Sequence, residues 1–155
     1  MVTIALDSGA VDHVIGPDDL PSSAVIGSVT GARVGRSFVA ANGEPMHTHG
    51  EVMLACDGGD DGHSTASFAV TDVSRPLQSV SRMCDQGFEV LFTGRVARVR
   101  DPKTGRIVAR FPRRGGLYVR DVRIRAGAAP VTAARAAKLG ERRPAKVFRR
   151  QGQRR

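Results

Sequence analysis

The chain has 155 residues, a length that suits one domain, and its 41% hydrophobic content is typical of a globular protein. No apolar run approaches the roughly 18 residues of a membrane-spanning helix, and no signal-peptide pattern opens the chain. Two cysteines exclude a scaffold of several disulfides. We therefore expect a cytoplasmic or nuclear protein without a membrane partner. The net charge of +9 is uneven: residues 1–72 sum to −8, residues 73–125 to +9 and residues 126–155 to +8.

Residues 1–125 consist of short apolar runs separated by turn signals, which predicts an all-β, mostly antiparallel domain. The predicted strands cover residues 2–7, 24–29, 36–41, 45–56, 64–73, 88–92, 95–100, 106–111 and 117–124. Asn42-Gly43 predicts a tight hairpin turn, because both residue types tolerate positive φ angles. The sequence DPKTG at 101–105 predicts a second turn.

One short helix is predicted over residues 77–87. Pro76 precedes this segment, and Gly87 stands where glycine often ends a helix. Leu77 and Cys84 would share one face of the helix, so we expect the Cys84 side chain in the core.

Residues 126–155 combine few large apolar side chains with nine basic residues, which predicts a basic disordered tail. Such a tail can bind phosphate backbones without sequence preference, and it can equally be a solvated segment without a specific partner. The arginines between residues 95 and 114 offer a second basic surface. Nucleic-acid binding there would require Phe111 or Tyr118 as a stacking platform, and the alternative is a solvated basic sheet.

The residues best placed for chemistry are Asp7, Ser8 and Gly9, which directly follow an apolar strand. A buried strand would fix the Asp7 carboxylate, Gly9 permits a tight turn, and Ser8 can donate a hydrogen bond to the carboxylate. General acid–base catalysis by carboxylates uses two that share a proton, and the chain has one such triplet. A second Asp7 must therefore come from another copy of the chain across a two-fold interface. The alternative is an ordinary turn.

Residues 6–16 (LDSGAVDHVIG) resemble the active-site segment of retropepsin-like aspartic proteases, specifically those of copia-type retrotransposons. Residues 39–54 resemble the flap hairpin of that family. Residues 77–92 resemble its Leu-x-Ser-Val-Ser helix and the strand after it, and residues 100–122 resemble the segment that joins protease to integrase. The resemblance thus extends in order over most of the chain.

This resemblance implies a small closed β-barrel that acts as a homodimer on a peptide or polyprotein substrate. Asp7 would be the catalytic aspartate, one per protomer, and Ser8, Gly9 and Ala10 would support it. Asn42 and Gly43 would belong to a flap over the substrate. The implied organisation is a protease domain at 1–93, a β-rich pre-integrase-like linker at 94–125 and the basic tail at 126–155.

Some features depart from the family pattern. Val11 stands where the family usually has Ser or Thr, and only six residues precede Asp7, so we expect the N-terminal strand of the dimer sheet to be truncated. The alternative function is therefore a catalytically inactive β-domain fragment whose basic C-terminal half binds nucleic acid.

We expect neither a metal nor a cofactor. His47 and His49 form no compact zinc pattern with Cys56 or Cys84, and the acidic residues after Cys56 lack the regular ligand spacing of a calcium loop. His13 could support the turn after Asp7, or it could be a buried structural histidine.

Overall fold

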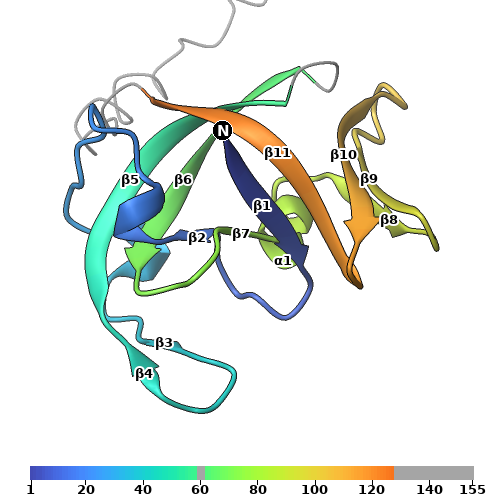
Figure 1. Cartoon of the computed structure of the whole chain (residues 1–155). Coiled ribbons are helices and arrows are strands. Elements are labelled where there is room, and N and C mark those ends of the chain that lie inside the picture. Colours follow the sequence, from blue (N-terminus) through green and yellow to red (C-terminus); the bar gives the residue numbers. More distant parts are fainter. Residues whose placement is uncertain (59–61, 128–155) are drawn as a thin grey trace, which may run out of the picture.

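Strands dominate the fold, so the predicted all-β class is confirmed (Figure 1). The structure, a computed structural model, describes residues 1–58 and 62–127, and most of the predicted tail therefore lies outside the described residues. The strands are β1 (Val2–Asp7), β2 (Val14–Ile15), β3 (Phe38–Val39), β4 (Pro45–Met46), β5 (Thr48–Asp57), β6 (His63–Thr71), β7 (Leu77–Ser79), β8 (Glu89–Phe92), β9 (Val96–Arg100), β10 (Ile107–Arg114) and β11 (Leu117–Ala126). The helical elements are α1 (Val80–Asp85) and two 3₁₀ turns, η1 (Pro17–Asp19) and η2 (Gly31–Arg33).

Six strands form a closed ring in the order β1-β7-β2-β6-β5-β11, because β11 also pairs with β1. Strand β1 runs parallel to β7, with Asp7 opposite Ser79, and antiparallel to β11, with Ala5 opposite Val119. Beyond β11 the pairing continues through β10 and β9 to β8, which forms the edge of the sheet, and β3 and β4 form a separate hairpin. Figure 1 shows this hairpin projecting from the ring on the side where β1 ends. The end of β1 is therefore held by neighbouring strands.

The apolar residues of β1 join two core clusters. Ile4 packs with Phe68 and Val122 inside the ring, and Leu6 packs with Phe111 and Met83 below the β9–β10 hairpin. Ile4, Phe68 and Phe111 are fully buried. Burial of one such side chain stabilises the fold by about 1.5–3 kcal/mol, so both clusters contribute to holding β1 in place.

Most predicted strands are confirmed, with ends that differ by at most three residues, namely those at 2–7, 64–73, 88–92, 95–100, 106–111 and 117–124. The predicted turns are also present. Gly43 has a φ of +87° in the β3–β4 turn, and Gly105 has a φ of +72° before β10.

Three strand predictions are wrong in extent. The apolar run at 24–29 forms no strand, because Gly27 alone makes an isolated bridge to Glu51 and Val25 stays 76% exposed. The predicted strand 36–41 shortens to β3. The predicted strand 45–56 divides at His47 into β4, which pairs with β3, and β5, which pairs with β6.

The predicted helix over 77–87 is wrong in its first turn. Residues Leu77–Ser79 form β7, whose backbone pairs with β1 and β2, and the helix begins at Val80. Ser79 is the N-cap, since its side chain accepts a hydrogen bond from the Arg82 amide. Cys84 is exposed rather than in the core, and Met83 is the buried residue of α1.

Candidate functional site

Asp7 lies at the end of β1, where the chain leaves the sheet. Its Oδ1 accepts a hydrogen bond of 2.7 Å from the Gly9 amide. This is the one hydrogen bond that the Asp7 side chain makes with the described residues. A Cβ atom on Gly9 would lie 3.3 Å from the same oxygen, closer than most Cβ contacts. Gly9 therefore permits the close approach of the turn to the carboxylate, as the sequence predicts. Ser8 is exposed beside this turn.

Hydrogen bonds to Ser79, at the start of α1, hold the loop that follows Asp7. The Ser79 hydroxyl donates to the carbonyl oxygen of Ala10 at 2.6 Å, and the Ser79 amide donates to Nδ1 of His13 at 2.9 Å. His13 is 2% exposed, and its ring centroid lies 5.5 Å from that of Phe68. Both interpretations of His13 from the sequence therefore hold together: it is buried, and it supports the loop.

The environment of His13 keeps its imidazole neutral. Burial, which outweighs the attraction of Asp12, lowers the pKa of His13 to about 4. Near neutral pH the ring is therefore uncharged, and its Nδ1 accepts the hydrogen bond from Ser79.

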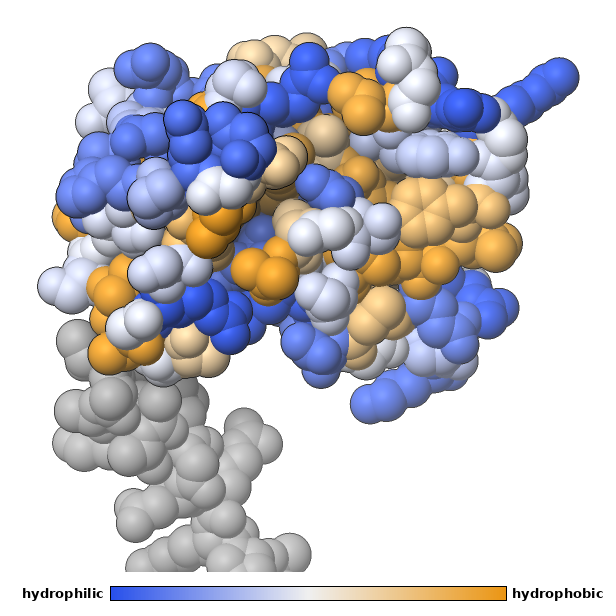
Figure 2. Space-filling view, turned by 90° about the horizontal axis from the view of Figure 1, so that it is seen from below, coloured by the Kyte–Doolittle hydropathy of each residue, from blue (hydrophilic) through white to orange (hydrophobic). Residues whose placement is uncertain are grey.

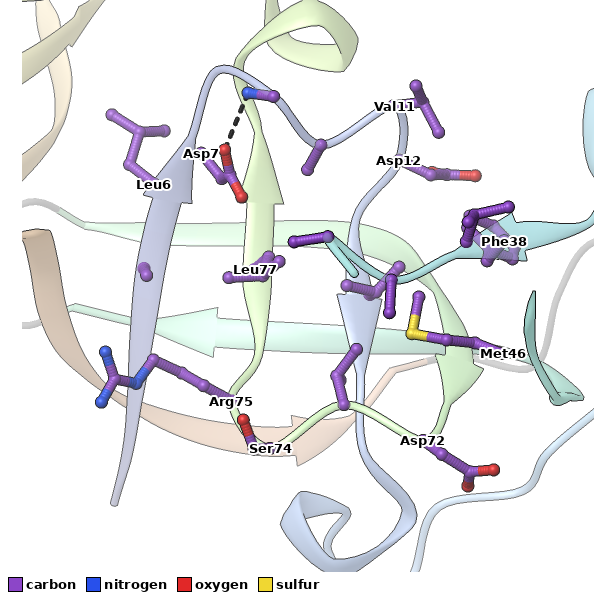
Figure 3. A pocket seen from close by; sticks show the side chains of 18 of the residues that line it. Leu6, Asp7, Val11, Asp12, Phe38, Met46, Asp72, Ser74, Arg75 and Leu77 are labelled. Carbon is purple, nitrogen blue, oxygen red and sulfur yellow. Dashed lines mark hydrogen bonds between the residues drawn. The ribbon is translucent and has the colours of Figure 1, made fainter. Parts of the chain in front are cut away.

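A pocket of about 1050 Å³ opens beside Asp7 (Figure 3). Its walls come from the end of β1, the loop after it, the β3–β4 hairpin and the segment that leads into β7. The lining residues are mostly apolar, and the hairpin contributes Phe38, Val39, Ala40, Ala41 and Met46.

Asn42 and Gly43 lie at the tip of this hairpin, beyond the residues that line the pocket. The Gly43 amide donates to the Ala40 carbonyl at 2.9 Å, and the Asn42 side chain accepts a hydrogen bond of 3.1 Å from the Glu44 amide. The fold thus brings Asp7, Gly9 and Ala10 together with the hairpin arm before this turn, rather than with the turn residues themselves.

A buried ion network that was not predicted from the sequence adjoins the pocket. Arg33 reaches Asp12 through two hydrogen bonds of 2.8 and 2.9 Å, and it reaches Glu51 through one of 3.0 Å. All three side chains are at most 5% exposed. Arg33 also donates to the Ser67 hydroxyl and, at 2.8 Å, to the Ser67 carbonyl oxygen. The guanidinium group of Arg33 therefore connects its own segment to three others, which contain Asp12, Glu51 and Ser67.

The network holds both carboxylates ionised. Burial alone would raise the pKa of Asp12, but the hydrogen bonds and charge of Arg33 outweigh it, so the pKa lies below its usual value. Glu51 behaves likewise, with Thr30 and Arg33 overcoming its burial. One signal of this network is present in the sequence: Arg33 and Arg36 are the two basic residues among the first 72.

The charges that line the pocket differ in their partners. Asp12 is held by Arg33, and Asp72 lies 2.7 Å from Nε2 of His49. Asp7 has no ion pair with a described residue, so it is the carboxylate left for a ligand. Arg75 is the single cationic side chain among the described residues that line the pocket.

Other predicted features lie outside this pocket. Phe111 is fully buried, so it is unavailable for stacking, and Tyr118 is half-buried with its hydroxyl bonded to the Thr93 carbonyl at 2.6 Å. Within residues 1–58 and 62–127, no cluster of three or more potential ligands is arranged to hold a metal ion. In the same part of the chain, no helix has the length and apolar character needed to cross a membrane.

The sequence matches no model of a known protein family, and a search of curated proteins finds no match.

Proposed function

We propose that this chain is the protomer of a homodimeric aspartic endopeptidase of retropepsin type. The observation that carries the proposal is the position of Asp7 in the wall of a large apolar pocket that a β-hairpin also lines. A pocket of this size accommodates several side chains of an extended peptide. The ordered sequence resemblance supports the same assignment.

The second carboxylate of the pair comes from a second copy. The other aspartates of the pocket, Asp12 and Asp72, are engaged with Arg33 and His49, so one chain offers Asp7 alone. Apolar side chains near Asp7 support a two-fold contact, because Val11 is 59% and Leu117 is 46% exposed.

The edge of the sheet adds to this apolar surface. Leu91 and Phe92 lie on the edge strand β8 and are 61% and 40% exposed, and the Phe92 ring packs edge-on against Tyr118. Figure 2 shows apolar side chains gathered on the side of the molecule where β8–β10 lie. An unpaired strand edge beside exposed apolar groups favours association with another chain. Burial of these groups by the second copy would stabilise the dimer.

The reaction follows from two carboxylates that share one proton. The ionised Asp7 takes a proton from a water molecule as that water attacks the peptide carbonyl carbon, and the protonated Asp7 of the other copy donates its proton to the carbonyl oxygen. As the C–N bond of the tetrahedral intermediate breaks, the carboxyl group that took the proton from water donates it to the leaving nitrogen. One hydroxyl of the intermediate returns its proton to the other carboxylate, so the pair again holds one proton. Neither a covalent intermediate nor a metal takes part.

The test is cleavage of a peptide library at mildly acidic pH by wild type, Asp7→Asn and Asp72→Asn. We expect Asp7→Asn to lose activity by at least 10²-fold, because the acid–base pair is destroyed, and Asp72→Asn to remain within a few-fold of wild type. Asp72→Asn is a matched control, since it removes a carboxylate from the same pocket. Equal activity of wild type and Asp7→Asn, or no cleavage by wild type, would refute the assignment.

The alternative, an inactive β-domain that binds nucleic acid through its basic C-terminal half, has less support among the described residues. Phe111 is buried, and Arg100 and Arg114 are paired with Glu89 and Asp121. Titration of the full chain with a generic oligonucleotide at two salt concentrations tests this alternative. Binding that weakens steeply with salt would support it.

A further inference from the structure

The charge distribution of the pocket bears on which peptides enter it. Most of its lining is apolar, including Leu6, Val14, Phe38, Met46 and Leu77. Of its charged groups, Asp12 is paired with Arg33, and Asp72 lies within hydrogen-bond distance of the His49 ring. Asp7 is reserved for the reaction under the proposed function. Arg75 is thus the pocket charge that remains for recognition of a ligand.

Arg75 is exposed and forms neither a side-chain hydrogen bond nor an ion pair within the described residues. It precedes Pro76, whose carbonyl oxygen accepts the Ala5 amide at 3.0 Å, so the backbone beside Arg75 is fixed against β1. A charged side chain on a fixed backbone at a pocket wall can select ligands by charge.

Arg75 and Asp7 lie at opposite ends of β7 (Figure 3). Asp7 is level with Ser79 in the parallel β1–β7 pair, and Arg75 precedes Ser79 by four positions. Since the chain bends at residues 74 and 75, a rise of about 3.3 Å per extended residue gives an upper limit of about 13 Å for the separation of these two backbone positions. An extended peptide spans the same distance with about four residues.

We infer that Arg75 is a specificity-determining residue that selects peptides with an acidic side chain within about four residues of the bond at Asp7. The inference rests on the proposed function and adds a substrate class to it. The preferred substrate has apolar side chains at its centre, which the pocket wall contacts, and a Glu or Asp to one side, which pairs with the Arg75 guanidinium.

The expected size of the preference follows from the exposure of Arg75. Exposed ion pairs change affinity by a factor of about two to five, and the effect decreases with salt. Replacement of Arg75 by Glu reverses the sign of the local charge, so it should reverse the preference rather than abolish it.

The experiment compares labelled peptides that share one apolar centre and differ by Glu, Gln or Lys at each position up to four residues from it. For wild type, Arg75→Gln and Arg75→Glu, kcat/KM is measured on each peptide, with Arg95→Glu as the control for an exposed arginine outside the pocket. We expect wild type and Arg95→Glu to favour Glu over Lys by at least about threefold at one position. Arg75→Gln should show no preference, and Arg75→Glu should favour Lys.

A binding measurement separates this inference from the proposed function. Fluorescence polarisation of the same peptides on Asp7→Asn, with and without Arg75→Glu, reports charge preference without catalysis. Reversal of the preference in binding supports the role of Arg75 even if wild type cleaves nothing. Cleavage that depends on Asp7 but is indifferent to peptide charge in wild type would overturn the role of Arg75 and leave the proposed function intact.

Discussion

Replacement of Arg33 by Met tests the buried ion network most sharply. The substitution keeps a long side chain but removes the cation that contacts both Asp12 and Glu51, which are 1% and 4% exposed. Loss of one partner from a buried ion pair costs about 3–5 kcal/mol, because the remaining charge is left without compensation. For a domain whose total stability is about 5–15 kcal/mol, this is a large share.

The cost of Arg33→Met should depend on pH in a defined direction. Without Arg33, the pKa values of Asp12 and Glu51 in the folded state rise from their lowered values, because burial is then opposed only by the remaining contacts with Arg82 and Thr30. The variant is therefore least stable relative to wild type at pH 7, and the difference shrinks as the pH falls and the two carboxylates take up protons. Removal of Arg33 also takes away one of the charges that lower the pKa of His13, and this acts in the same direction, because the variant then loses less stability when His13 takes up a proton.

The assay is urea unfolding followed by far-UV circular dichroism, since the chain has no tryptophan. Wild type and Arg33→Met are compared at pH 7 and pH 4.5, with Arg36→Met as the control for an exposed arginine of the same segment. We expect Arg36→Met to change the free energy of unfolding by less than about 0.5 kcal/mol. A cost of Arg33→Met below about 1 kcal/mol at pH 7, or a cost that does not change with pH, would refute the reasoning.

One further prediction concerns the buried histidine that supports the loop after Asp7, and another concerns a close backbone contact of β5. The pKa of His13 is about 4 in the folded protein and near 6.5 in the unfolded chain. The contribution of His13 to stability is therefore complete above pH 6.5. As the pH falls from 6.5 toward 4, the free energy of unfolding decreases by about 3 kcal/mol. His13→Asn should flatten this part of the stability profile, measured by urea midpoints from pH 7.5 to 4.5, and an unchanged profile would contradict the assignment. Gly50→Ala should destabilise the fold by about 1–3 kcal/mol, because its φ is +141° and a Cβ would lie 2.2 Å from the Gly27 carbonyl oxygen. In thermal unfolding, Gly94→Ala is the control, with no heavy atom within 4 Å of the added Cβ, and equal melting temperatures for the two variants would argue against the predicted strain.

Local patterns in the sequence were sufficient to predict most strands and the turn after Asp7. Alternating apolar residues and Gly-containing turns report on neighbours close in the chain, and these signals identify β1, β6 and the β9–β10 hairpin. They failed at Leu77–Ser79, where helical spacing was present but the backbone pairs with β1 and β2. They failed again at residues 24–29, where an apolar run remains largely exposed.

The parts of the site that could not be predicted depend on residues far apart in the chain. Arg33 meets Asp12, Glu51 and Ser67 only because the ring brings their segments together. The closure of that ring through β1 and β11 also has no local signal, since its partners are more than 100 positions apart. Long-range contacts of this kind follow from the tertiary fold rather than from propensity or periodicity.

The pairing of two Asp7 side chains is the central claim, and subunit mixing tests it most directly. Folded Asp7→Asn protein is added in threefold excess to a fixed amount of wild type, and peptide cleavage is measured after exchange. If the active unit contains two copies, random exchange leaves only about a quarter of the wild-type subunits in intact pairs, and activity should fall to about that fraction. Activity that is unchanged by the added variant would contradict the account, because each chain would then act alone.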